Sequence, residues 1–303
     1  SAEPDTVKAK RKECHVSKIQ SPAQLPEFKP PPPSTLSAQT ALARAYFNPW
    51  FQGLDSLKLD RPALWVGNHT LYGLLDVPLM VAEIYSRHGV MLRGLGDRGH
   101  FELPGWGKLL VSAGMVLGAP EHCAALMEAR QHILVFPGGG REVMRRKGEA
   151  YQLIWKQRTG FARLAIEHGY DIIPFGSVGP DENFQILLDG RDISESRLWR
   201  LLSQRLPLDA YTRNGDMIPP LARGVGLSVL PRPQRYYFGF GRRIRTSQLK
   251  RDASDPDAVW AIRERVGRAV EKEIASLKAY RQTDRRKHWS VLRRWLAPLQ
   301  DND

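Results

Sequence analysis

The sequence has no apolar run long enough to cross a lipid bilayer. It contains 303 residues, and the most apolar stretch, residues 109–119, is short and is interrupted by a serine and two glycines. A spanning helix needs roughly 20 consecutive apolar residues. The first 20 residues are polar and charged, so we expect no secretory signal. Two cysteines, Cys14 and Cys123, are too few for a disulfide framework and indicate a reducing compartment.

Several catalytic and cofactor motifs are also missing. The sequence has neither a P-loop GxxxxGK[ST] nor a GxSxG elbow, which removes the signatures of nucleotide hydrolysis and of the usual serine hydrolases. Histidines and cysteines are too scattered to predict a metal site. Residues 94–99 match the spacing GxGxxG, but the preceding strand is short and the next residues, through Pro104, are not expected to open a helix. We therefore expect no metal and no dinucleotide cofactor.

The charge balance favours an anionic partner. Lysine and arginine exceed aspartate and glutamate by 45 to 32, which gives a formal net charge of +13. Nucleic acid, an anionic membrane surface and a phosphate-bearing substrate all fit such a charge. The chain's 303 residues are enough for one large α/β domain or two small ones, and a hydrophobic content of 42% supports a core.

The predicted organisation is α/β, with a mostly parallel sheet flanked by helices and a C-terminal amphipathic helical segment. Residues 1–34 are a polar, proline-rich tail, and residues 35–250 form the α/β domain. Within it, residues 190–233 interrupt the pattern and could cover the site. Apolar runs and helical spacing elsewhere predict strands at residues 64–66, 90–92, 115–117, 133–136, 172–175 and 236–240, and helices at residues 37–47, 74–85, 106–112, 120–130 and 160–168.

Residues 251–303 are predicted to be a basic amphipathic helical extension. Asp255 and Pro256 open a helix whose apolar residues recur at helical spacing. A second short helix places four apolar residues on one side, with several arginines around them: Trp289, Leu292, Trp295 and Leu296. Such a helix can lie in the interface of an anionic membrane, or it can pack on the protein's own core.

Two short turns indicate chemistry. Gly67, Asn68 and His69 follow the strand at residues 64–66, and a glycine-rich segment, Phe136 to Glu142, follows the strand at residues 133–136. A neutral histidine at the carboxyl edge of a sheet can remove a proton from a hydroxyl. Backbone amides of a glycine-rich turn can hold an oxyanion or a phosphate, and an arginine adds a fork-shaped donor. The candidates for binding substrate or an oxyanion are Asn68 in the first turn and Gly138, Gly139, Gly140 and Arg141 in the second. A possible phosphate-binding trio follows, Arg145, Arg146 and Lys147.

These motifs resemble the glycerolipid acyltransferase superfamily, which includes the lysophosphatidic acid acyltransferases. The resemblance consists of the Asn-His turn, the Phe-Pro-x-Gly-x-Arg-like turn and the later apolar-Pro strand at residues 172–174, in that order over about residues 60–245. The segments at residues 136–142, 146–151 and 173–179 are most similar to the branch that holds type-2 diacylglycerol acyltransferases and plant phytyl ester synthases. The resemblance implies that His69 is the general base.

The sequence departs from the superfamily pattern at three positions. The usual acid five residues after the histidine is replaced by Leu74, so Asp76 and Glu142 are both candidates to orient His69. Gly138 stands where the superfamily usually has glutamate, which again is similar to the diacylglycerol branch. Pro120 stands where an arginine helps phosphate-bearing acceptors, which favours a neutral acceptor.

The resemblance implies an O-acyltransferase that moves a fatty acyl group from acyl-CoA or acyl carrier protein to a lipid hydroxyl, with no cofactor. Its implied partners are the thioester donor, a lipid acceptor and an anionic membrane surface, and its implied location is peripheral, on a cytoplasmic or organelle membrane. A lysophospholipid acyltransferase is the alternative enzyme. A non-catalytic basic module that binds membrane or nucleic acid is the alternative of another class, since residues 242–296 hold 16 basic and 7 acidic residues. No nucleic-acid motif is present, so we expect no nucleic-acid partner.

Overall fold

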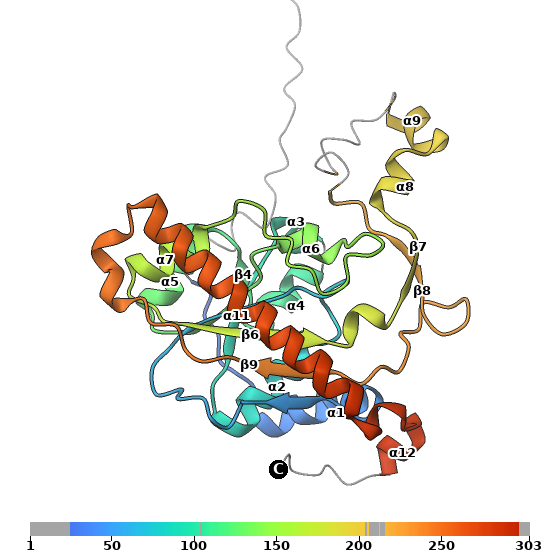
Figure 1. The fold of residues 1–303 in the computed structure, drawn as a ribbon, viewed down its shortest axis with the longest axis horizontal. Coiled ribbons are helices and arrows are strands. Elements are labelled where there is room, and N and C mark those ends of the chain that lie inside the picture. Colours follow the sequence, from blue (N-terminus) through green and yellow to red (C-terminus); the bar gives the residue numbers. More distant parts are fainter. Residues whose placement is uncertain (1–24, 104, 204, 206–211, 213–215, 297–303) are drawn as a thin grey trace, which may run out of the picture.

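The computed structural model describes residues 25–103, 105–203, 205, 212 and 216–296. Its centre is a seven-stranded sheet with the order β1-β9-β6-β2-β5-β3-β4. The five strands from β6 to β4 are parallel, and β9 joins β6 antiparallel and β1 parallel. The α/β prediction is confirmed (Figure 1). The strands are β1 (Trp50–Gln52), β2 (Leu64–Gly67), β3 (Leu92–Gly96), β4 (Val116–Leu117), β5 (His132–Val135), β6 (Ile172–Val178) and β9 (Tyr237–Phe240).

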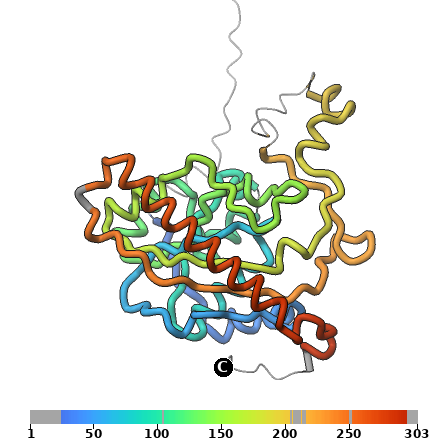
Figure 2. Tube along the Cα trace, viewed as in Figure 1, coloured from blue at the N-terminus to red at the C-terminus, as the bar shows by residue number. Residues whose placement is uncertain are grey.

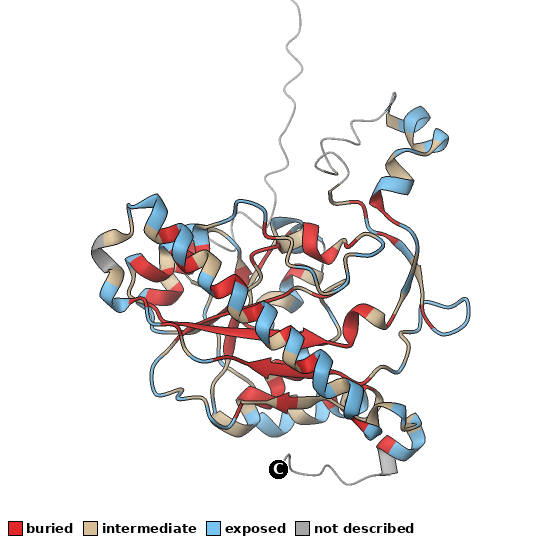
Figure 3. Cartoon of the chain, viewed as in Figure 1, coloured by how far each residue is buried: buried red, intermediate tan, exposed pale blue. Residues whose placement is uncertain are grey.

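Helices cover both faces of the sheet, as expected when parallel strands are buried on both sides. Successive residues of β2 point to opposite faces: Leu64 and Val66 join one apolar cluster and Trp65 joins the other. The first cluster includes residues of α5 (Pro120–Glu128), α7 (Gly160–Glu167) and α11 (Pro256–Thr283), and the second includes residues of α1 (Pro33–Phe47) and α2 (Val77–His88). Figure 3 shows the resulting buried centre.

The longest helix, α11, is part of the domain and not an extension of it. Asp255 caps the helix by accepting a hydrogen bond from the Asp257 amide, and Pro256 occupies the first turn. Its buried residues form one stripe that lies against the sheet (Figure 2): Val259, Ile262, Val266, Val270, Ile274 and Leu277. The predicted division at residue 250 is therefore wrong for α11, because this stripe closes one face of the core.

The C-terminal end of the described chain also packs on the domain. Helix α12 (Val291–Leu296) lies against α1, and the Arg294 guanidinium is buried where it donates to the carbonyls of Tyr46 and Pro233 at 2.9 and 2.8 Å. Trp289 is partly buried, and the Arg293 guanidinium lies 4.4 Å from its ring centre. The side chains of Trp295 and Leu296 lie outside the described residues, so the proposed apolar face is only partly visible.

The predicted tail ends earlier than residue 34. Pro33 begins α1, and the preceding described residues are packed: Leu25 contacts the core, and the Phe28 ring lies 4.6 Å from the Arg93 guanidinium. Residues 1–24 of the predicted tail lie outside the described residues. In the part of the chain that the structure describes, no helix is both long and apolar enough to span a membrane.

The interruption predicted at residues 190–233 corresponds to a unit that projects beyond the sheet. It contains a two-stranded antiparallel ribbon, β7 (Gln185–Leu188) with β8 (Leu221–Arg223), and two short helices, α8 (Gly190–Ser194) and α9 (Arg197–Ser203). Figure 1 shows these elements at one edge of the molecule. We call residues 185–203 and 216–232 the projecting unit.

The remaining elements are short. They are α3 (Arg98–Glu102), α4 (Trp106–Ser112), α6 (Gly139–Val143) and the 3-10 turns Pro180–Glu182, Ser247–Asp252 and Arg285–His288. Helix α3 corrects the expectation that no helix opens within the GxGxxG stretch: the Asp97 side chain caps it by accepting a hydrogen bond from the Gly99 amide at 3.1 Å.

If α11 closes the core, truncating its buried stripe should destabilise the whole domain. Leu277 is fully buried, and its side chain lies against Gly239 of β9. We expect Leu277→Ala to lower the free energy of unfolding by about 2–5 kcal/mol. The matched control, exposed Glu271→Ala on the same helix, should change it by less than about 0.5 kcal/mol. Urea unfolding followed by circular dichroism gives both values, and equal effects would contradict this role for α11.

Candidate active site

Neighbouring strands bring the two predicted turns together. β2 and β5 pair in parallel, and Val66 stands opposite Val135. The next residues of each strand therefore leave the sheet at the same edge, His69 after β2 and Phe136 after β5. At this edge, the His69 imidazole stacks on the Phe136 ring with ring centres 4.1 Å apart and an interplanar angle of 19°. Two residues that are 67 positions apart in the sequence are thus in direct ring contact.

A tight turn fixes the other side of the His69 ring. Tyr72 and Gly73 both have positive φ angles, 61° and 59°. A Cβ atom on Gly73 would overlap the imidazole, so the glycine is needed both for the backbone conformation and for the space above the ring. The imidazole is held between Phe136 and Gly73, and within the described residues its buried Nδ1 atom has no hydrogen-bond partner.

This environment keeps His69 neutral. Burial, with smaller contributions in the same direction from Arg145 and His100, lowers the pKa of His69 to about 3. A general base must be unprotonated, and a histidine with this pKa is neutral at any physiological pH. The site therefore supplies the base in its working protonation state.

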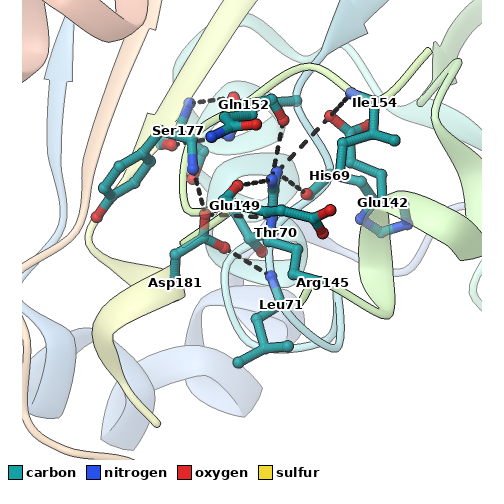
Figure 4. Close-up of polar contacts among 12 residues, drawn as sticks. His69, Thr70, Leu71, Glu142, Arg145, Glu149, Gln152, Ile154, Ser177 and Asp181 are labelled. Atoms are coloured by element: carbon teal, nitrogen blue, oxygen red, sulfur yellow. Dashed lines mark hydrogen bonds and ion pairs between the residues drawn. The ribbon is translucent and has the colours of Figure 1, made fainter. Parts of the chain in front are cut away.

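One buried cation ties the histidine turn to the segment after the glycines. Arg145 is 1% exposed. Its Nη2 atom donates to the His69 carbonyl at 2.6 Å, and Nη1 donates to the carbonyls of Glu149 and Gln152 at 2.6 and 2.8 Å. Its Nε atom lies 3.2 Å from an Asp181 carboxylate oxygen, and Nη2 lies 3.6 Å from Glu142. Figure 4 shows the guanidinium at the centre of these contacts.

Asp181 and Asn68 complete the frame. The Asp181 carboxylate accepts hydrogen bonds from the amides of Leu71 and Tyr151 at 2.7 and 2.8 Å. The Asn68 side-chain amide donates to the Ser177 carbonyl at 3.0 Å and accepts from the Ser177 amide at 2.8 Å. Asn68 therefore fastens the histidine turn to β6, and the substrate contact expected for it stays a prediction.

The glycine-rich segment opens the short helix α6, and packing explains two of its glycines. A Cβ atom on Gly138 would overlap the Glu142 carboxylate, and one on Gly140 would overlap the Met217 side chain. Gly139 has a φ of 50° and donates its amide to the Phe136 carbonyl at 3.0 Å. Among the described residues, the Gly138 and Gly140 amides have no hydrogen-bond acceptor. These two amides are the donors that could meet an oxyanion.

Glu142 lies fully buried behind this turn. Burial raises the pKa of Glu142 to about 7, against the opposing effects of Arg145 and of the His69 and Ile154 backbone amides. Within the described part of the chain, its Oε2 atom has no hydrogen-bond partner. The carboxyl group can therefore change protonation state near neutral pH beside both turns.

The sequence is similar to known acyltransferases over the same region. Residues 49–178 match the family model described as Acyltransferase. The predicted resemblance to acyltransferases is confirmed over this part of the chain.

Relatives of known name match beyond residues 49–178. Phytyl ester synthase 2, chloroplastic, from Arabidopsis thaliana is 29% identical over 78% of this chain and 35% of its own length. The human DGAT1/2-independent enzyme synthesizing storage lipids is 28% identical over 55% of this chain and 52% of its own length. The chain spans about a third of the length of the phytyl ester synthases it matches. The solved structure of the 1-acyl-sn-glycerophosphate (LPA) acyltransferase PlsC from Thermotoga maritima covers 79% of this chain and 78% of that chain, with 14% identity and a TM-score of 0.45.

Within the described residues, neither candidate acid, Asp76 or Glu142, is joined to the His69 imidazole by a hydrogen bond. The Asp76 carboxylate accepts hydrogen bonds from the hydroxyls of Thr70 and Ser177 at 3.0 and 2.7 Å. Burial raises the pKa of Asp76, and these two donors oppose that rise. Asp76 thus braces the residue next to His69 rather than the ring itself. That Asp76 or Glu142 orients the His69 ring therefore stays a prediction.

The predicted anion-binding arginines are placed differently from the expectation. Arg141 is buried and donates to both Glu149 carboxylate oxygens at 3.0 and 2.5 Å, so its fork is already occupied. Arg145 lies inside the protein and not in an exposed trio. Lys147 is paired with Asp192 at 2.7 Å, and Arg146 lies 3.6 Å from Asp216. Partly exposed Arg146 and Lys147 remain the candidates for a phosphate.

Four residues that support the histidine turn were not predicted for this role from the sequence: Gly73, Arg145, Asp181 and Ser177. The signal for Asp181 was a Pro-Asp pair directly after the strand of β6. For Gly73, it was a Tyr-Gly pair four residues after the histidine. No local signal distinguishes Arg145 from Arg146, because the burial of one and the exposure of the other depend on how β2, β5 and β6 are arranged.

Removing the buried cation should therefore cost far more than removing its neighbour. We expect Arg145→Met to lower the free energy of unfolding by about 3–5 kcal/mol, because Asp181 and Glu142 lose their buried counter-charge. Arg146→Met, at the partly exposed adjacent position, should cost less than about 1 kcal/mol. Chemical unfolding of both variants gives the two values. Similar values would contradict the central role of Arg145.

The pKa of His69 gives a pH prediction. Its folded-state value, about 3, lies below the ordinary value of about 6.5, so the unfolded chain binds this proton more readily. The contribution of His69 to stability is therefore complete above about pH 6.5 and is lost as the pH falls toward 3. Nitrogen-15 NMR of the imidazole should show a neutral ring at pH 5. A titration midpoint near 6.5 would contradict the described burial.

Proposed function

We propose that the chain catalyses O-acyl transfer from a thioester donor, acyl-CoA or acyl carrier protein, to a lipid hydroxyl. The observation that carries the proposal is the neutral His69 imidazole stacked on Phe136. Phe136 begins the glycine turn, in which, within the described residues, the backbone amides of Gly138 and Gly140 are unpaired. A base and an oxyanion cradle at one sheet edge are the two elements that acyl transfer needs. The match of residues 49–178 to the Acyltransferase family model supports the same assignment.

The proposed reaction proceeds in two steps. His69 accepts the proton of the acceptor hydroxyl while the oxygen attacks the thioester carbon, which forms a carbon–oxygen bond and a tetrahedral oxyanion. The Gly138 and Gly140 amides stabilise this charge. The intermediate collapses with cleavage of the carbon–sulfur bond, and the imidazolium returns its proton to the leaving thiolate. Because its pKa is low, His69 is a strong donor of that proton.

A neutral acceptor such as diacylglycerol or a long-chain alcohol fits the chain best. Pro120 begins α5 and brings neither a side-chain charge nor a backbone N–H to this position, where an arginine would serve a phosphate-bearing acceptor. The space that a side chain at position 138 would need is occupied by the Glu142 carboxylate, which brings no positive charge for a phosphate. The printed names of two relatives, a phytyl ester synthase and an enzyme synthesizing storage lipids, agree with a neutral lipid product.

The proposal includes peripheral attachment to a cytoplasmic or organelle membrane. A lipid acceptor must be reached at a bilayer surface, and the net charge of +13 favours an anionic one. The chloroplastic names of two relatives support an organelle.

His69→Ala tests the mechanism, and a panel of acceptors tests the substrate class. We expect the variant to lose acyl transfer by about 10²–10⁴-fold, since it removes a general base. The control His288→Ala alters an exposed histidine of the 3-10 turn Arg285–His288 and should keep wild-type turnover. Mass spectrometry of the products from labelled acyl-CoA should show diacylglycerol or long-chain alcohols preferred to lysophosphatidic acid.

Near-wild-type turnover by a folded His69→Ala protein would refute the mechanism. A clear preference for lysophosphatidic acid would instead support the lysophospholipid acyltransferase alternative. A chain that binds anionic vesicles or nucleic acid but turns over no thioester would support the non-catalytic alternative.

A further inference from the structure

The projecting unit exposes an unusual amount of apolar surface. Leu227 and Val229, in the loop that follows β8, are 87% and 84% exposed. Leu198 on α9 is 67% exposed. Figure 3 shows much of this edge as exposed. Further exposed apolar side chains of the unit are Leu187, Leu188, Leu201, Leu202, Leu221, Val225 and Leu230. Apolar side chains exposed in this number outside a core mark a site of interaction with another apolar phase or partner.

Arginines accompany these apolar side chains. Neither α9 nor the loop at Leu227 and Val229, which we call the apolar tip, contains an acid, and exposed Asp192 and Glu195 precede α9. On α9, exposed Arg197 and Arg200 alternate with the exposed leucines, and the helix contains no Asp or Glu. Residues 217–251 contain no Asp or Glu at all. Arg223 and Arg232 both donate to the Gln185 side chain, at 2.9 and 3.4 Å, and within the described residues neither pairs with a carboxylate. Their charges are available to an anionic surface.

The unit is fastened to the active site. Tyr72 follows His69 by three residues, and its hydroxyl donates a hydrogen bond to the Pro220 carbonyl at 2.9 Å. Met217 lies against Gly140, and Asp216 lies 3.4 Å from the Arg141 guanidinium. Between the two parts is a cavity of about 240 Å³, whose lining includes Leu71 of the histidine turn and Phe184 and Ile186 at the start of the ribbon. A surface held by the unit therefore has a fixed position relative to the base and the cradle.

We propose that the projecting unit is the surface by which the chain docks on an anionic lipid bilayer, with the loop at Leu227 and Val229 and the face of α9 entering the interface. Apolar side chains flanked by arginines suit a bilayer interface, where the side chains leave water and the cations meet lipid phosphates. A second copy that docked through the same loop would bring no acid to these arginines, since residues 217–232 contain no Asp or Glu. The inference rests on the proposed lipid acceptor and assigns its membrane contact to this unit instead of α12.

Vesicle flotation with the full chain tests the assignment. Vesicles of phosphatidylcholine with phosphatidylglycerol serve as the anionic surface, and phosphatidylcholine alone as the neutral one. Leu227→Asp/Val229→Asp should weaken partitioning into anionic vesicles by about tenfold or more, because two exposed apolar contacts become charged. Arg197→Gln/Arg200→Gln should reduce the preference for anionic over neutral vesicles. Both changes lie at exposed positions, so circular dichroism should show an unchanged fold.

Two control variants place matched changes elsewhere. Leu42→Asp alters an 81% exposed leucine on α1, and Leu292→Asp alters a 65% exposed leucine on α12. Both should float like the wild type. If Leu292→Asp abolishes flotation while Leu227→Asp/Val229→Asp does not, the anchor is α12 and the proposal is wrong. If Leu227→Asp/Val229→Asp floats normally, or only converts a dimer to a monomer in light scattering, the surface does not bind membrane and the proposal is equally wrong.

A soluble assay separates this inference from the proposed function. With a short-chain alcohol and a short-chain acyl-CoA in the absence of vesicles, Leu227→Asp/Val229→Asp should keep wild-type turnover. Wild-type protein that floats but never turns over the soluble pair would refute the acyl transfer and leave the docking surface supported. A variant that loses soluble turnover as well as flotation would assign these residues to the chemistry and overturn a purely docking role.

Discussion

The arrangement of the candidate site depends on one buried cation. Arg145 lies almost fully inside the protein, where an uncompensated charge costs several kcal/mol, so its surroundings must supply carbonyls and carboxylates in fixed positions. The carbonyl of His69 is one of these, and the carboxylates of Asp181 and Glu142 are two others. The same charge that fixes the backbone of the histidine turn also lowers the pKa of the imidazole. Burial is the larger cause of that low pKa, and the charge of Arg145 adds to it.

The sheet explains why residues so distant in sequence can form one site. Parallel pairing of β2 with both β5 and β6 places the ends of three strands at one edge. Each strand then contributes a different function: β2 leads to the imidazole, β5 leads to the glycine turn, and β6 supplies Ser177 and leads to Asp181, which hold the first turn through Asn68 and Leu71. The stack of His69 on Phe136 is the point at which the first two meet.

Much of this could be predicted from the sequence because it is local. Helix α4 was predicted with the bounds it has, and the strands β2, β5, β6 and β9 within a few residues, since their apolar patterns are uninterrupted. Properties that depend on tertiary contacts could not be predicted. Arg145 and Arg146 are both arginines and are adjacent in the sequence. Only the packing of the sheet buries the first, where it holds the histidine turn, and leaves the second partly exposed. Likewise, α11 has the charge of a surface extension, but its buried stripe closes the core. The β7–β8 ribbon pairs exposed residues, so no alternation of apolar and polar side chains marked it.

The projecting unit connects the chemistry to the source of its substrate. An acyl acceptor that lives in a bilayer must place one hydroxyl at His69 while its chains remain in an apolar phase, so the distance between the base and the membrane has to be fixed. A unit that carried only exposed apolar residues on a free loop would not fix it. Here the unit is joined to the histidine turn through Tyr72 and Pro220, and to the glycine turn through Met217 and Asp216. Contacts from one unit to both halves of the site mean that docking at its apolar tip would orient the base and the cradle together, as a single rigid arrangement facing the bilayer.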